Sequence, residues 1–121
     1  MTLKSFAVGV ALLAAMPAYA HEAKSPHGGR LAVAGAYHAE LVAKDKAIEI
    51  FLTNESDKPV DTKGFKGVAI FSLGGKAERI TLVPSERGAL SGAAAADLPP
   101  VLKGAVQLTA PDGKTATARF D

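Results

Sequence analysis

The sequence of 121 residues contains no cysteine and no tryptophan, and its only methionines are Met1 and Met16. Without cysteine the chain can form no disulfide and offers no thiolate to a metal ion. Without methionine after position 16 the remainder offers no thioether, which excludes a methionine-rich Cu(I) site there. The stability of the folded domain must therefore come from burial of apolar surface and from backbone hydrogen bonds.

Long apolar runs are also missing after position 20, so we expect no membrane-spanning segment there. The first 20 residues have the parts of a secretory signal: Lys4, an apolar stretch over Phe6–Met16, and the small-residue cleavage site Ala18–Ala20. The apolar stretch is too short for a permanent membrane helix, which needs about 20 apolar residues. We therefore predict a signal helix that is cleaved after export to the periplasm, which makes His21 the first mature residue.

Charge is nearly balanced in the predicted mature chain. Loss of Lys4 leaves 13 of the 14 basic residues against 12 acidic residues. Such a balance, with basic and acidic residues interspersed, argues against a nucleic-acid-binding surface. Removal of 20 of the 121 residues leaves 101, enough for one modest domain.

Catalytic motifs are absent as well. Ser72, Ser85 and Ser91 lie outside any nucleophile-elbow motif, and no glycine-rich phosphate cradle occurs. An oxidative copper enzyme built on an N-terminal histidine would need a broad, usually aromatic substrate surface. Tyr37 is the only tyrosine after the predicted signal. We therefore predict that the protein is not an enzyme.

From Arg30 onward, short alternating segments are separated by turn residues, a pattern typical of antiparallel β-structure. We predict a small antiparallel β-sandwich, immunoglobulin-like or related, over residues 30–121. A mobile, histidine-containing arm over residues 21–29 precedes it. The predicted strands, about seven, are Arg30–Ala34, Tyr37–Ala43, Ala47–Thr53, Gly67–Leu73, Ala77–Val83, Gly104–Ala110 and Thr115–Phe120.

The connections between these strands have distinct chemistry. Gly74-Gly75 suits a primed hairpin turn because both glycines tolerate positive φ. Pro111–Gly113 is a turn sequence between the last two strands. The stretch Gly88–Pro100 is expected to be an irregular crossover between the two sheets, since Gly92 and the two prolines leave no room for a helix.

One hairpin allows a register to be predicted. A two-residue turn at Asp45-Lys46 places Tyr37, Ala39, Leu41 and Ala43 on one face with Ile48, Ile50 and Leu52. A three-residue turn beginning at Lys44 would mix His38 and Glu40 among Ile48, Ile50 and Leu52. Because a shift of one residue turns every side chain of a strand to the other face, the two-residue turn is favoured. The outward face then carries His38, Glu40, Val42, Glu49, Phe51 and Thr53.

The three histidines, His21, His27 and His38, all fall within the first 18 residues of the predicted mature chain. An N-terminal histidine is a chelate, because its α-amine, with a pKa of about 7.7–8.0, and its ring nitrogen can close one ring on a metal ion. Pro26 and the two glycines after His27 let the backbone turn closely past the ring, toward the strand that carries His38.

These donors lead to the main functional prediction. Imidazole, amine and carboxylate suit Cu(II) or Zn(II). His38 and Glu40 are two residues apart and share one strand face. We predict a divalent metal site, Cu(II) or Zn(II), with His21, His27 and His38 as ligands and Glu40 as a ligand or as the partner that orients one.

Two alternatives remain open at this point. Each of these side chains could instead be a solvated polar residue, since exposed strand faces need no function. The protein could also be a metal-free interaction module of the cell envelope, presenting a strand edge or a patch of Val42 and Phe51 to a partner.

The stretches Ser25–Leu31 (Ser-Pro-His-Gly-Gly-Arg-Leu) and Tyr37–Leu41 (Tyr-His-Ala-Glu-Leu) resemble a segment near the N-terminus of periplasmic adaptor subunits of heavy-metal efflux pumps. Those segments have a Gly-Pro-His-Gly-Gly-Arg-Leu core, in which Ser25 here replaces the usual glycine, and a strand carrying Glu-Leu. The resemblance extends over residues 25–60, and the helical hairpin and lipoyl-like parts of an adaptor are absent. It implies a stand-alone relative of one module that buffers a metal or hands it to a metal-resistance efflux system, with an efflux adaptor as partner.

A looser similarity is to small copper-resistance β-sandwich proteins whose mature N-terminal histidine ligates Cu(II). This similarity concerns His21 alone.

Overall fold

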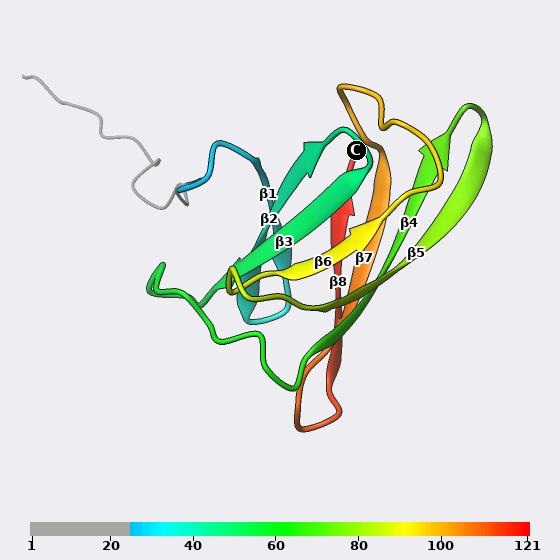
Figure 1. Cartoon of the computed structure of the whole chain (residues 1–121). Coiled ribbons are helices and arrows are strands. Elements are labelled where there is room, and N and C mark those ends of the chain that lie inside the picture. Colours follow the sequence, from blue (N-terminus) through cyan, green and yellow to red (C-terminus); the bar gives the residue numbers. More distant parts are fainter. Residues whose placement is uncertain (1–24) are drawn as a thin grey trace, which may run out of the picture.

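The computed structural model describes residues 25–121, which form eight β-strands (Figure 1). The predicted signal helix, its cleavage after Ala20 and the ligand His21 lie outside the described residues. The strands are β1 (Arg30–Ala34), β2 (Tyr37–Lys44), β3 (Ala47–Thr53), β4 (Lys66–Leu73), β5 (Lys76–Pro84), β6 (Leu90–Ala93), β7 (Gly104–Thr109) and β8 (Thr115–Phe120).

All eight strands belong to one antiparallel sheet with the order β1-β2-β3-β6-β5-β4-β7-β8. The sheet curls until β1 and β8 lie side by side, so that it forms a nearly closed barrel (Figure 1). The prediction of an all-β fold is confirmed, but the prediction of a two-sheet sandwich is wrong. Alternation along a strand marks one buried face, and this pattern is the same whether the opposite wall is a second sheet or the same sheet curled over.

Strand β6 is what joins the two halves of the sheet. It pairs with β3, with Ile48 opposite Gly92, and with β5, with Val83 opposite Ser91. Gly92 has to be a glycine here, because a Cβ atom would press on the carbonyl oxygen of Thr81 and lie 2.9 Å from Ile80 Cγ2. The prediction of an irregular crossover through these residues is therefore wrong for β6.

The hairpin of β2 and β3 has the predicted register. His38 lies opposite Thr53, Glu40 lies opposite Phe51, and the two-residue turn has Asp45 at a φ of 58°. The positive φ at Asp45 explains how a primed turn forms without glycine, since aspartate tolerates this region better than most residues.

The glycine hairpin is also confirmed. Gly74 and Gly75 join β4 to β5 with φ values of 61° and 84°, and both lie in open space at the tip. The turn around Pro111–Gly113 joins β7 to β8, as predicted.

The core fills the inside of the barrel. Its largest fully buried side chains are Phe71, Phe120, Ile48, Ile50, Leu82, Leu90, Leu108 and Val106. Since these residues come from β3 to β8, one apolar cluster is shared by nearly every strand.

A side chain bridges the seam where β1 and β8 meet. Arg30 of β1 donates hydrogen bonds to the carbonyl oxygens of Leu102 and Asp121, the latter at 2.8 Å. Its guanidinium carbon lies 5.7 Å from the centre of the Phe120 ring. No ladder of backbone pairs joins β1 to β8 within residues 25–121, so Arg30 ties the two edges together.

The described part of the chain contains no helix with the length and apolarity required to cross a bilayer.

Candidate functional site

The outer face of β2 is covered by a turn formed by residues 25–29. The amide of Gly28 donates to the carbonyl oxygen of Ser25 at 3.0 Å, and Gly28 has a φ of 74°. Gly29 then passes so close to the strand that a Cβ atom would press on the carbonyl oxygen of Leu41 and lie 2.9 Å from Glu40 Cγ. The two glycines are therefore required for different reasons. Gly28 allows the turn, and Gly29 allows the backbone to approach β2 closely.

The turn closes over the carboxylate of Glu40, which is only 2% exposed. Glu40 Oε2 accepts hydrogen bonds from the amides of His27 at 2.9 Å and Gly29 at 2.8 Å. Glu40 Oε1 lies 2.8 Å from His27 Nδ1. Three donors on one buried carboxylate compensate its loss of water, because hydrogen bonds to a charged acceptor are among the stronger ones in proteins.

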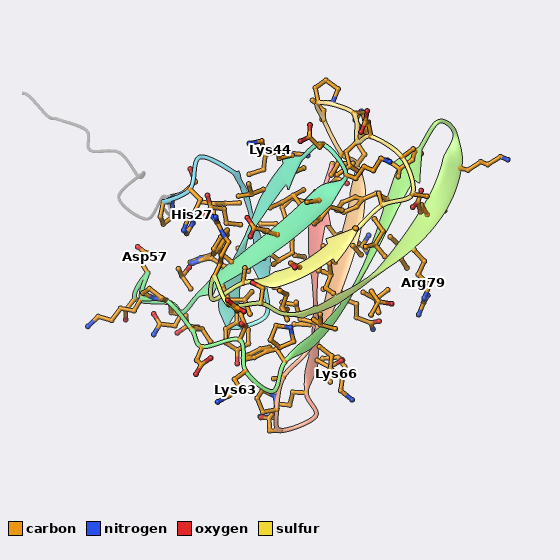
Figure 2. The ribbon with its side chains drawn as sticks, in the orientation of Figure 1. His27, Lys44, Asp57, Lys63, Lys66 and Arg79 are labelled. Atoms are coloured by element: carbon orange, nitrogen blue, oxygen red, sulfur yellow. The ribbon has the colours of Figure 1, made fainter. Side chains whose placement is uncertain are left out.

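The imidazole of His27 has a fixed orientation. A carboxylate only accepts, so Nδ1 carries the proton, and the lone pair of the neutral ring lies on Nε2. The ring also stacks on Phe51, with 3.6 Å between ring centres and 11° between planes. The side chain remains 40% exposed, and Nε2 has no hydrogen-bond partner within residues 25–121. Figure 2 shows His27 on the outside of the barrel.

Glu40 and Phe51 are buried although they belong to the outward face of the hairpin, so the alternative of a solvated side chain does not hold for either of them. Phe51 is 8% exposed, because the ring of His27 covers it and the guanidinium carbon of Arg87 lies 5.9 Å from its centre. Arg87 is held there by its Nε, 2.9 Å from Glu49 Oε2. The expected patch of Val42 and Phe51 is therefore not an open apolar surface.

A pocket of about 480 Å³ lies beside the stacked rings of His27 and Phe51. We call it the Phe51 pocket. The turn of residues 25–29, strands β2 and β3, the loop after β3 and the turn between β5 and β6 all contribute to it. Its lining residues are Pro26, His27, Glu40, Phe51, Leu52, Thr53, Pro59, Val60, Asp61, Arg87 and Gly88.

His38 lies elsewhere on the same face, and the acidic side chain near it is Asp57. The Nδ1 atom of His38 is 3.7 Å from the Asp57 carboxylate, too far for a hydrogen bond, and it is buried without a hydrogen-bond partner among residues 25–121. Asp57 comes from the loop after β3 and has a φ of 61°. Figure 2 places Asp57 on the same side of the barrel as His27.

The structure thus brings together two of the predicted site residues, His27 and Glu40, and leaves His38 with Asp57. Among residues 25–121 no group of three or more His, Asp or Glu side chains converges on a point that could hold a metal ion. Both oxygens of Glu40 accept hydrogen bonds from the turn, an arrangement that orients the imidazole of His27.

Two residues of this region, Gly29 and Arg87, did not emerge as site candidates from the sequence, and Phe51 was considered only as part of an interaction patch with Val42. The glycine pair after His27 was the available signal, since it indicated a close backbone approach. For Arg87 the sequence holds no signal, because the contact depends on β6 joining β3 to β5.

Comparison with protein-family models, with curated proteins and with solved structures finds no match for this chain.

Proposed function

We propose that the protein binds a divalent metal ion, Cu(II) or Zn(II), through His27 Nε2 together with the amine and imidazole of His21. The observation that carries the proposal is the contact between His27 Nδ1 and the buried Glu40 carboxylate. Histidines that ligate metal ions usually donate their other ring nitrogen to a carboxylate or carbonyl oxygen, which fixes the tautomer and raises the basicity of the ligating nitrogen.

The position of the turn supports a shared site. Ser25 is exposed next to His27, and only three residues separate it from His21. An extended chain spans at most about 3.3–3.6 Å per residue, so His21 stays within about 14 Å of Ser25. Two nitrogens from His21 and one from His27 would leave room for water or for a donor from a partner.

The biological role that we propose is metal buffering in the periplasm or hand-over to an efflux system. It is supported by the resemblance of Ser25–Leu31 and Tyr37–Leu41 to efflux adaptor segments. These residues also have a structural role in this chain, because the Pro-His-Gly-Gly turn and Glu40 hold each other in place. The role in transfer therefore needs its own test with an adaptor.

Calorimetric titration of the exported protein with Cu(II) and with Zn(II) tests the proposal, after mass spectrometry has defined the first residue. For whichever of the two ions binds more tightly, His27→Ala is expected to lower the affinity by at least about tenfold, because it removes one imidazole ligand. Glu40→Gln is expected to lower the affinity for the same ion by about 10- to 100-fold, because the imidazole loses its carboxylate partner.

One further variant is the control, and another extends the test to the second proposed ligand. His38→Ala should leave affinity unchanged, because the structure pairs His38 with Asp57 and not with His27. His21→Ala should weaken binding as much as His27→Ala does. An affinity that is unaffected by both His21→Ala and His27→Ala would overturn the proposal, provided that circular dichroism shows both variants folded.

A further inference from the structure

The Phe51 pocket has an apolar floor. Pro26, Phe51, Pro59 and Val60 are among its lining residues, and the ring of Phe51 stacks on His27 with Arg87 nearby. Pockets for small ligands commonly have volumes of about 300–1,000 Å³ and a few polar groups among apolar walls. The volume here, about 480 Å³, falls in that range.

Two opposite charges lie on the pocket wall without pairing with each other. Arg87 comes from the turn between β5 and β6, and Asp61 comes from the loop after β3. The described residues form no ion pair between them, since Arg87 Nε is paired with Glu49 and Asp61 Oδ1 accepts from the amide of Lys63 at 2.9 Å.

Each charge keeps capacity for a ligand. A guanidinium has five N–H donors, and the contact with Glu49 uses the one on Nε. The two terminal nitrogens of Arg87 can still bind a carboxylate through two parallel hydrogen bonds. Asp61 has a second oxygen, and its side chain takes part in a local turn that holds the carboxylate in place.

We propose that the Phe51 pocket binds a free amino acid with an aromatic or large apolar side chain. Its carboxylate would bind Arg87, its ammonium group would bind Asp61, and its side chain would pack against Pro59 and Val60, beside the covered ring of Phe51. A zwitterion fits one cation and one anion on opposite segments of an apolar pocket better than a ligand with a single charge does. This site adjoins the proposed metal site, since His27 lines the pocket, but it uses neither His21 nor the lone pair of His27.

Calorimetric titration of the exported protein with L-phenylalanine tests the proposal. A chelator such as EDTA is present throughout, so that an amino acid coordinated to a metal ion does not contribute. The same titration uses 3-phenylpropionate, which lacks the ammonium group, and 2-phenylethylamine, which lacks the carboxylate. Each analogue is expected to bind at least about tenfold more weakly than L-phenylalanine, because hydrogen bonds to charged groups contribute about 1.5–3 kcal/mol each.

The chain offers matched controls for both charges. Asp61→Asn removes the charge but keeps the oxygen that accepts from Lys63, and Asp112→Asn makes the same change in an equivalent turn with Lys114, outside the pocket. Asp61→Asn should abolish the preference for L-phenylalanine over 3-phenylpropionate, whereas Asp112→Asn should preserve it.

Arg87→Ala and Arg79→Ala form the second pair. Arg79 is exposed on β5 and does not line the pocket (Figure 2). Arg87→Ala should abolish the preference over 2-phenylethylamine, and Arg79→Ala should leave it intact. The proposal is overturned if L-phenylalanine does not bind, if it binds no better than its analogues, or if the Asp61 and Arg87 variants bind it like the unaltered protein.

Discussion

At the scale of single residues, Glu40 has the most unusual environment in the described part of the chain. A carboxylate on the outside of a β-barrel would ordinarily be solvated, yet two amides and one imidazole from residues 27–29 enclose this one. An ionised carboxylate is costly to bury unless it is hydrogen-bonded or paired. These hydrogen bonds therefore hold the turn of residues 25–29 against β2, and the turn fixes the orientation of the His27 imidazole.

Gly29 is predicted to be essential for this contact. Gly29→Ala should lower the free energy of unfolding by about 1–3 kcal/mol, the usual cost of inserting a methyl group where no space exists. The added Cβ would lie 2.9 Å from both Glu40 Cγ and Val42 Cγ2. Urea unfolding followed by circular dichroism measures the effect.

Gly28→Asn is the matched control for this prediction. No atom lies within 4 Å of a Cβ at position 28, and asparagine tolerates its positive φ of 74°. A loss of stability at Gly28 as large as the loss at Gly29 would contradict the assigned role of close approach.

At the scale of the elements, the sequence predicted the strands more completely than it predicted their arrangement in the sheet. The hairpin of β2 and β3 could be placed in register because a single apolar face had to result. Strand β6 was missed because Leu90–Ala93 has neither alternation nor β-branched residues, and its pairing depends on partners far away in sequence. The burial of Glu40 was missed for the same reason, since its cover comes from a turn 13 residues earlier.

Strand β6 is predicted to depend on its glycine. Gly92→Ala should lower the free energy of unfolding by about 1–3 kcal/mol, because the new methyl group overlaps β5 where the two strands meet. Thermal or urea unfolding tests this, with Gly74→Asn at the open hairpin tip as the control. A neutral Gly92→Ala variant would mean that β6 and β5 are less closely packed than described.

At the scale of the whole molecule, the barrel has one interruption in its hydrogen bonding, between β1 and β8. Two unpaired strand edges in one molecule are usually protected in some way, because exposed edges favour pairing with other chains. Here the two edges face each other, and the side chain of Arg30 spans them. Closure therefore depends on side-chain contacts at one place and on backbone ladders elsewhere.

Arg30→Ala is predicted to loosen this seam. The variant should lose about 1.5–3 kcal/mol of stability, the usual net range for hydrogen bonds made by a charged group. Amide hydrogen exchange should become faster in β1 and β8 and stay unchanged in β4 and β5, which lie away from the seam. Arg119→Ala, an exposed change on β8, is the control.

The enclosure of Glu40 also has an evolutionary consequence. The carboxylate is bound by the amides of positions 13 and 11 residues before it and by the imidazole of His27, so a change at one of the three positions affects the other two. A descendant that loses the acid at position 40 no longer has a reason to keep a glycine at position 29, and a bulky replacement at 29 displaces the acid. Homologous chains should therefore retain or discard this trio as a unit, and a correlated pattern at these sites would reveal the contact without any coordinates.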